Sequence, residues 1–190
     1  MTSARLIDQL TQQEMDAGKA YGADSKFFHG CWQDRQDDLV YHPDYAAFAR
    51  TYAQVSGALD SAVAKSILQE DLTVYSGYGR GYSILGSLTG DAVKFVGLVY
   101  QYPGFISTST NQRIAEDKFL RVGASAGTRP TFLEFKLLKG QIALDMNAVG
   151  ITGELEYLLP RRTPFSIVDA KETRVQDVDD AVLHLILAAV

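Results

Sequence analysis

Two glutamates, Glu154 and Glu156, stand two residues apart in the run Gly153–Pro160, whose other side chains are mainly apolar. Residues i and i+2 of a β-strand point to the same face, so a strand through this run would place the two carboxylates side by side, about 6–7 Å apart. Like charges on one face are costly unless a cationic group lies opposite them. The pair is therefore either a candidate site or an ordinary solvent-facing edge strand.

A carboxylate pair can bind a metal, perform acid–base chemistry, or hold a cation and stabilise a developing positive charge. The metal site is the weakest of these interpretations. The three histidines, His29, His42 and His184, are scattered without ligand spacing, and no further Asp or Glu near the pair completes an oxygen cage. We therefore predict no metal.

Composition limits the class of protein. The 190 residues carry a net charge of −5, which argues against a nucleic-acid-binding surface and against attraction to anionic membranes. Cys31 is the only cysteine, so no internal disulfide can form, and Met1–Asp16 lacks the basic and apolar regions of a signal peptide. No run of 18 apolar residues is present. These features predict action in a reducing cytosol, either of the producing cell or of another cell.

The chain divides into a helix-rich first part and a strand-rich second part. Helical spacing of apolar residues occurs in Ala4–Lys19, in Pro43–Leu68 with a break near Gly57, and in Asn111–Val122. Six short β-rich runs follow position 71: Leu72–Tyr75, Phe105–Ser107, Thr131–Leu137, Leu155–Leu159, Phe165–Val168 and Val182–Leu187. The order predicts an α+β fold in one domain of residues 1–190, with a helical part at 1–70 and a mainly antiparallel β core at 71–190.

The order of three separated segments along the chain is informative. They are Leu59–Tyr75, Gly104–Ser109 with the sequence Ser107-Thr108-Ser109, and Glu154–Pro160 followed by Thr163–Ile167. Together they resemble the catalytic core of the mono-ADP-ribosyltransferase toxins of the Arg/Ser-Thr-Ser/Glu-x-Glu class, over roughly residues 55–170. Each motif alone is ordinary strand composition. The order and the flanking residues carry the resemblance, which implies an ADP-ribosyltransferase-like fold.

The resemblance implies an enzyme that transfers ADP-ribose from NAD to a side chain of a target protein. In such an enzyme Glu156 would stabilise the oxocarbenium-like state of the NAD ribose. Glu154 would hold the acceptor, for which a glutamate at this position favours an arginine, whose guanidinium suits a charge-assisted hydrogen bond; a Thr, Ser or Asn acceptor stays open. Ser107 would orient Glu156 and the NAD-binding strand, and Ser107, Thr108 and Ser109 would contact NAD from that strand.

The first motif departs from the family. Where the family reads Val-Tyr-Arg, this chain reads Val74-Tyr75-Ser76, and serine cannot replace a bidentate, permanently charged group that contacts the NAD phosphates. Arg80, in a glycine-rich loop, is one candidate replacement; other groups sharing the phosphates, or a weakened enzyme, are the alternatives. Phe119 either packs on nicotinamide or faces the core from a helix.

The resemblance further implies a bacterial effector or virulence toxin, or a phage protein. Such a protein would be secreted or injected into a target cell without a classical signal peptide. Two rival functions remain open at this point. One is a glycohydrolase that cleaves NAD without labelling a protein. The other is a transferase-like module that has lost its phosphate arginine and binds a partner without catalysis.

Overall fold

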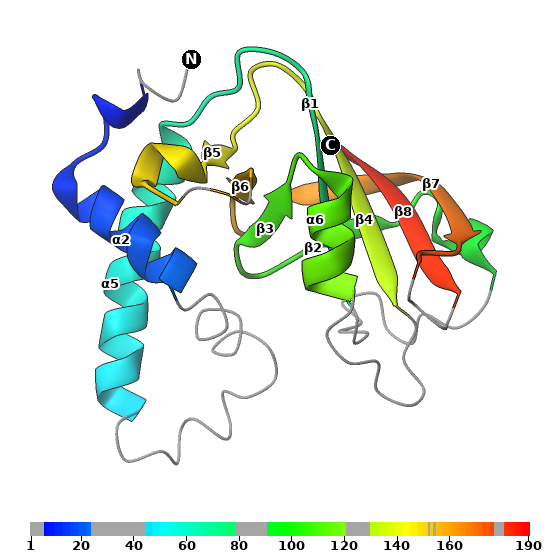
Figure 1. Cartoon of the computed structure of the whole chain (residues 1–190), viewed down its shortest axis with the longest axis horizontal. Helices are drawn as coiled ribbons and strands as arrows, with labels where there is room; N and C mark the ends of the chain where they lie inside the picture. The colour runs from blue at the N-terminus through cyan, green and yellow to red at the C-terminus, as the bar shows by residue number, and fades with distance from the viewer. Residues whose placement is uncertain are drawn as a thin grey trace.

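The structure is a computed structural model, and it describes residues 6–23, 45–78, 91–120, 130–151, 153, 155–176 and 181–190, with the backbone alone at 45–49 and 119. Figure 1 shows the helices of the N-terminal part on one side of a sheet that the rest of the chain builds. N-terminal helices followed by a mainly antiparallel sheet confirm the predicted α+β class.

Among the described residues, two helices belong to the N-terminal part, α2 (Gln12–Ala23) and α5 (Tyr45–Ala64). The first begins later than the predicted Ala4–Lys19, because Thr11 and Glu14 cap it reciprocally. The Thr11 amide donates to the Glu14 carboxylate at 2.6 Å, and the Glu14 amide donates to the Thr11 hydroxyl at 3.3 Å. The second runs unbroken through Gly57, so the predicted break there is wrong. A helical glycine costs about 1 kcal/mol, which the buried side of α5 outweighs.

Eight strands of the described chain form one sheet in the order β2-β7-β8-β4-β1-β3-β6-β5. Only β4 and β8 pair in parallel; the other neighbours are antiparallel. The bounds are β1 (Leu72–Tyr78), β2 (Val99–Gln101), β3 (Ile106–Ser109), β4 (Thr131–Leu137), β5 (Leu144–Asp145), β6 (Glu156–Leu159), β7 (Pro164–Thr173) and β8 (Val182–Ala189).

Short helical turns connect these strands. They are η1 (Ala92–Phe95), α6 (Gln112–Ala115), the π-helical turn η2 (Glu116–Leu120) and η3 (Met146–Val149). The predicted helix Asn111–Val122 therefore exists as α6 and η2. Asn111 caps it, since its side chain accepts a hydrogen bond from the Arg113 amide at 3.0 Å.

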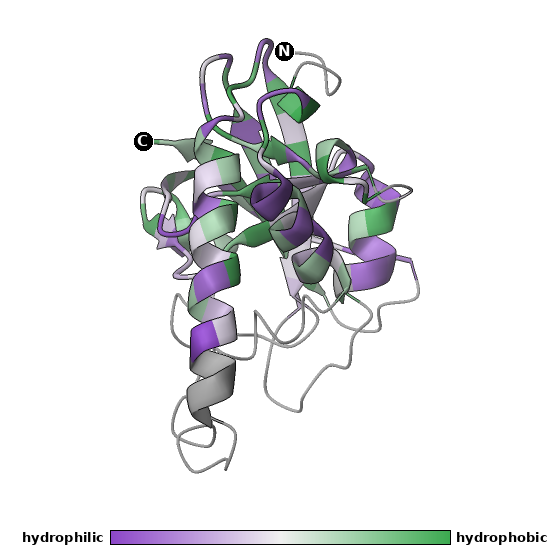
Figure 2. Ribbon diagram, turned by 90° about the vertical axis from the view of Figure 1, so that its left-hand side faces the viewer, coloured by the Kyte–Doolittle hydropathy of each residue, from purple (hydrophilic) through white to green (hydrophobic). Residues whose placement is uncertain are grey.

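The apolar core divides by the faces of the sheet. One cluster lies on one face of the sheet and includes Val74, Leu133 and Phe135 together with Phe95 of η1 and Tyr100 of β2. On the opposite face, α2 and α5 pack over β3, β5 and β6, while η2 packs over the β1–β4–β8 part through a smaller cluster. Figure 2, seen from the helical side, shows helices that carry both hydrophilic and hydrophobic residues in front of strands with hydrophobic segments. Helical elements therefore cover this opposite face of the sheet both over β3, β5 and β6 and over β1, β4 and β8.

No helix among the described residues is long and apolar enough to cross a membrane.

Candidate active site

The pairing of β3 with β6 brings the Ser-Thr-Ser segment next to Glu156. Ser109 lies directly opposite Glu156 and Ser107 lies opposite Leu158. Residues that face each other across antiparallel strands share one face of the sheet, with Cβ atoms about 5 Å apart. Ser107, Ser109 and Glu156 therefore lie on the same face, the one that α2 and α5 cover at one end.

Glu156 is the first residue of β6 and only 8% exposed. Just before it, Leu155 has a φ of 49°, so the backbone is left-handed and not extended there. The carbonyl of Leu155 accepts a hydrogen bond from the Thr110 amide at 3.1 Å, which attaches this bend to the end of β3. The predicted strand through both glutamates is therefore wrong at Leu155, and the same-face argument does not apply to the pair. Glu154 itself lies outside the described residues.

Ser107 contacts a residue that the sequence did not point to. Its Oγ lies 3.0 Å from the hydroxyl of Tyr21, a side chain of α2 that precedes it by 86 residues. The Tyr21 ring packs edge-on against Phe105, with centroids 6.0 Å apart. Tyr21 is 1% exposed. Burial raises the pKa of Tyr21 far above its ordinary value, and the negative charge of Glu156 raises it further, whereas the hydrogen bond with Ser107 opposes the change.

Thr108 and Ser109 use their hydroxyls within the protein. The Thr108 hydroxyl, on the face opposite to Glu156, donates to the Tyr157 carbonyl at 2.7 Å and so fastens β3 to β6. The Ser109 hydroxyl accepts from the Asn111 amide at 3.1 Å and shapes the turn into α6. Both side chains are buried. These contacts set the position of β3 relative to the Glu156 strand.

Ser76, the residue in place of the motif arginine, is also buried, with 3% of its surface exposed. Its hydroxyl donates to the Ser107 carbonyl at 2.8 Å. Ser76 thus ties β1 to β3 at the segment that carries the candidate site. Of the other predicted NAD contacts, Arg80 lies outside the described residues, and Phe119 belongs to η2 with its side chain outside the description.

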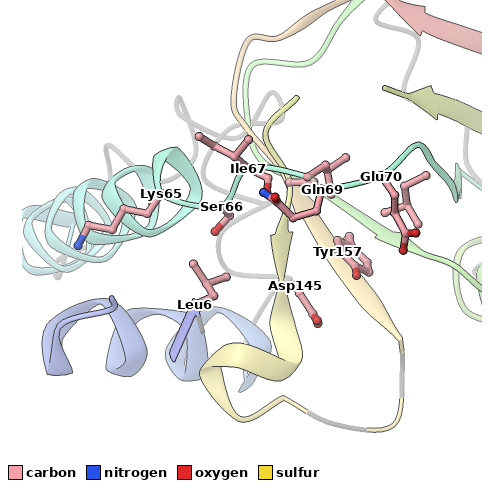
Figure 3. A pocket seen from close by; sticks show the side chains of 11 residues that line it. Leu6, Lys65, Ser66, Ile67, Gln69, Glu70, Asp145 and Tyr157 are labelled. Carbon is pink, nitrogen blue, oxygen red and sulfur yellow. The ribbon is translucent and has the colours of Figure 1, made fainter. Parts of the chain in front are cut away.

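A cavity of about 460 Å³ lies elsewhere, beyond the C-terminal end of α5 (Figure 3). Tyr157, whose side chain is on the face of β6 opposite to Glu156, lines it together with Glu70 and Asp145. Burial raises the pKa of Tyr157, and the charges of Asp145 and Glu70 raise it further. Neither Ser107 nor Glu156 lines this cavity, so it is separate from the candidate active site.

Within the described ranges, no three His, Cys, Asp or Glu side chains gather as a metal would require. The candidate site consists of a buried carboxylate beside hydroxyl groups. Such groups can accept hydrogen bonds from a ribose and stabilise a positive charge that develops on it.

Comparisons with known proteins agree with this arrangement. A family model described as ADP-ribosyltransferase exoenzyme matches residues 45–190. A sequence comparison with curated proteins found no match.

Among solved structures, the chain is similar to Plx2a, an ADP-ribosyltransferase toxin from Paenibacillus larvae, with 21% identity and a TM-score of 0.70 over 98% of this chain and 90% of that one. It is similar to the C3 exoenzyme of Clostridium limosum, with 20% identity and a TM-score of 0.63 over 94% and 86% of the two chains. The Vis toxin, an ADP-ribosyltransferase from Vibrio splendidus, gives 19% identity and a TM-score of 0.63 over 99% and 82% in its complex with agmatine. These likenesses show the shared fold.

Proposed function

The chain belongs to the ADP-ribosyltransferase exoenzyme family, and from this premise we propose that it transfers ADP-ribose from NAD to an arginine side chain of a target protein, with Glu156 as the catalytic carboxylate. Membership makes the protein an NAD-dependent ADP-ribosyltransferase, a toxin-type enzyme for which NAD is a substrate. The acceptor residue and the site residues are the proposed part.

The observation that carries the proposal is the register of β3 and β6, which sets Ser109 opposite Glu156 and Ser107 on the same face. A buried carboxylate at this position can stabilise positive charge on the nicotinamide ribose as its bond to nicotinamide breaks and the electron pair leaves with nicotinamide. The acceptor nitrogen then bonds to the same ribose carbon and passes its proton to solvent water. Low exposure of Glu156 strengthens this electrostatic effect, since few water molecules screen the charge.

Glu154 is proposed to hold the acceptor. The support is its type and spacing, because a carboxylate two residues before the catalytic one can pair with a guanidinium in a charge-assisted hydrogen bond. Agmatine, which occupies one of the similar structures, carries the same guanidinium group as arginine. An arginine acceptor accounts for both observations.

The cytosol of a target cell is the proposed place of action, reached by secretion or injection. The single cysteine of the chain suits a reducing compartment.

The test is labelling of a whole-cell lysate with biotinylated NAD, followed by mass spectrometry of each labelled protein. Glu156→Gln keeps the shape of the side chain and removes its charge, so labelling is expected to fall about 100-fold or more. Glu70→Gln is the matched control: Glu70 is exposed and lines the separate cavity, so labelling is expected to stay at the wild-type level.

A second assay uses agmatine as a small acceptor and measures nicotinamide release alongside transfer. Glu154→Ala is expected to lose transfer to agmatine and to retain NAD hydrolysis. Equal labelling by wild type and Glu156→Gln would contradict the role of Glu156. Nicotinamide release by wild type without a labelled protein in any lysate would make the chain a glycohydrolase.

A further inference from the structure

Tyr21 lies outside the part of the chain that the family model matches, yet it reaches the candidate active site. The match begins at residue 45, whereas Tyr21 belongs to α2. Its hydroxyl is 3.0 Å from Ser107 Oγ, and its ring is fixed against Phe105. The contact joins a helix at the start of the chain to the strand that carries the Ser-Thr-Ser segment.

The rest of α2 fixes where Tyr21 stands. On one side, the buried carboxylate of Glu14 accepts hydrogen bonds from Ser61 of α5 at 2.5 Å and from Lys65 at 2.8 Å. On the other side, Gly18 and Gly22 pack directly on Val149 and Ile151, since a Cβ atom at either glycine would lie 2.6 Å from those side chains. α2 is therefore held between α5 and the segment that leads to Glu156.

The geometry allows either hydroxyl of the pair to donate. Tyr21 remains protonated because burial keeps its pKa high, so it can always donate its proton to Ser107 Oγ. The hydroxyl of Ser107 then has its own proton available for a different acceptor. On that face of the β3–β6 pair, Glu156 supplies a buried carboxylate two residues along from the position opposite Ser107.

We propose that Tyr21 is a positioning residue of the transferase, which orients the Ser107 hydroxyl toward Glu156 by donating a hydrogen bond to Ser107 Oγ. The proposal rests on the function proposed above, because it assigns Tyr21 a part in the reaction that Glu156 supports. It makes α2 a component of the active site and not only a cover for the sheet. Tyr21 acts through Ser107 and does not touch the substrate.

The test is Tyr21→Phe, which removes the hydroxyl and keeps the ring that packs on Phe105. We expect kcat for nicotinamide release to fall about tenfold, with KM for NAD changed less than about twofold, because the loss affects orientation and not binding. The same change is then made in a Ser107→Ala protein. There we expect no further fall in kcat, since two residues that act as one unit are not additive.

Tyr100→Phe is the matched control. The Tyr100 hydroxyl is buried and makes a hydrogen bond to the Tyr78 hydroxyl at 2.8 Å, so the variant loses the same kind of contact in a different part of the core. Its kcat is expected to stay within about twofold of wild type. Thermal unfolding of each variant checks that the fold is retained.

A wild-type kcat in Tyr21→Phe, together with a loss of activity in Glu156→Gln, would overturn the role of Tyr21 and leave the proposed function in place. An equal fall caused by Tyr21→Phe with and without Ser107 would also overturn it, since Tyr21 would then not act through that hydroxyl. Unchanged activity in both Tyr21→Phe and Glu156→Gln would overturn the inference and the proposed function together.

Discussion

Arg161 and Asp60 are 101 residues apart in the sequence and form a two-point ion pair, through Nε at 3.0 Å and through Nη2. Asp60 belongs to α5 and Arg161 follows β6, so the pair joins the helical part to the strand that begins with Glu156. The same guanidinium lies over the Phe105 ring, 5.2 Å from its centroid. One arginine thus links α5, β6 and the residue before β3.

Asp60→Asn is expected to lower the free energy of unfolding by about 1 kcal/mol, since a two-point pair that is partly exposed contributes modestly. For a chain of this size the midpoint of thermal unfolding should fall by about 2–4 °C. Asp91→Asn is the control, because the Lys94–Asp91 contact is 4.0 Å long and highly exposed. Equal midpoints for the two variants would mean that the Arg161 pair adds nothing to stability.

The sequence predicted the elements that have a strong local pattern. β4 has the predicted bounds, Thr131–Leu137, because its long run of β-formers needs no distant partner to be recognised. β2 and β5 were not predicted, since strands of two or three residues exist only through pairing with β7 and β6. Contacts between distant segments, and not local preference, decide such short strands.

The candidate site divides in the same way. The residue types of Ser107 and Glu156 pointed to chemistry, and the observed register sets them on one face. Tyr21 was not predicted, because nothing local pairs it with a serine 86 residues later. The sequence Arg161-Arg162 is typical of an exposed turn, yet Arg161 is partly buried by its contacts with Asp60 and Phe105.

Glu14 gives the protein a pH-dependent stability. Burial opposes ionisation of its carboxyl group, but hydrogen bonds from Lys65, Ser61 and Thr11 outweigh that effect and lower the pKa of Glu14 from 4.5 to about 2. In the unfolded chain the group binds a proton at higher pH than in the folded protein. The stabilisation is therefore present above pH 4.5 and is lost as the pH falls toward 2.

We expect Glu14→Gln to flatten the decline of the unfolding free energy in this pH range, as measured by denaturant titrations from about pH 6 to about pH 2. Asp16→Asn removes an exposed carboxylate from the same helix and should keep the wild-type decline. A decline in Glu14→Gln as steep as in wild type would assign the acid sensitivity to other carboxyl groups.

The hydrogen bond from Thr108 to the Tyr157 carbonyl should contribute to both stability and activity. Thr108→Val keeps the shape of the buried side chain and leaves that carbonyl without its 2.7 Å donor, a loss of about 1–2 kcal/mol in unfolding free energy. The bond holds β3 against β6, so kcat for NAD cleavage should fall as well. Thr163→Val is the control, because its hydroxyl donates over 3.2 Å in a partly exposed turn. A stability loss no larger than that of the control would contradict this account.

Ser76→Arg decides what the departure from the family motif means. The Ser76 side chain is 3% exposed, and its neighbours Val74 and Leu133 belong to the apolar core. An arginine there would bury a charge and lose the hydrogen bond to the Ser107 carbonyl, so we expect a cost of about 4 kcal/mol or more in unfolding free energy and no gain in NAD affinity. Ser76→Ala, which loses the hydrogen bond alone, should cost about 1 kcal/mol.

Calorimetric titration with NAD, on the same samples used for thermal unfolding, separates the two meanings of Ser76. Tighter NAD binding by a Ser76→Arg protein that keeps its stability would show that the arginine side chain can leave the interior and reach the phosphates. Position 76 would then be one at which this chain has lost the phosphate contact that an arginine makes. The expected result, a large loss of stability at unchanged or weaker NAD affinity, would mean that serine is required here to join β1 to β3. The positive charge for the NAD phosphates must then come from another part of the chain, for which Arg80 is the first residue to replace.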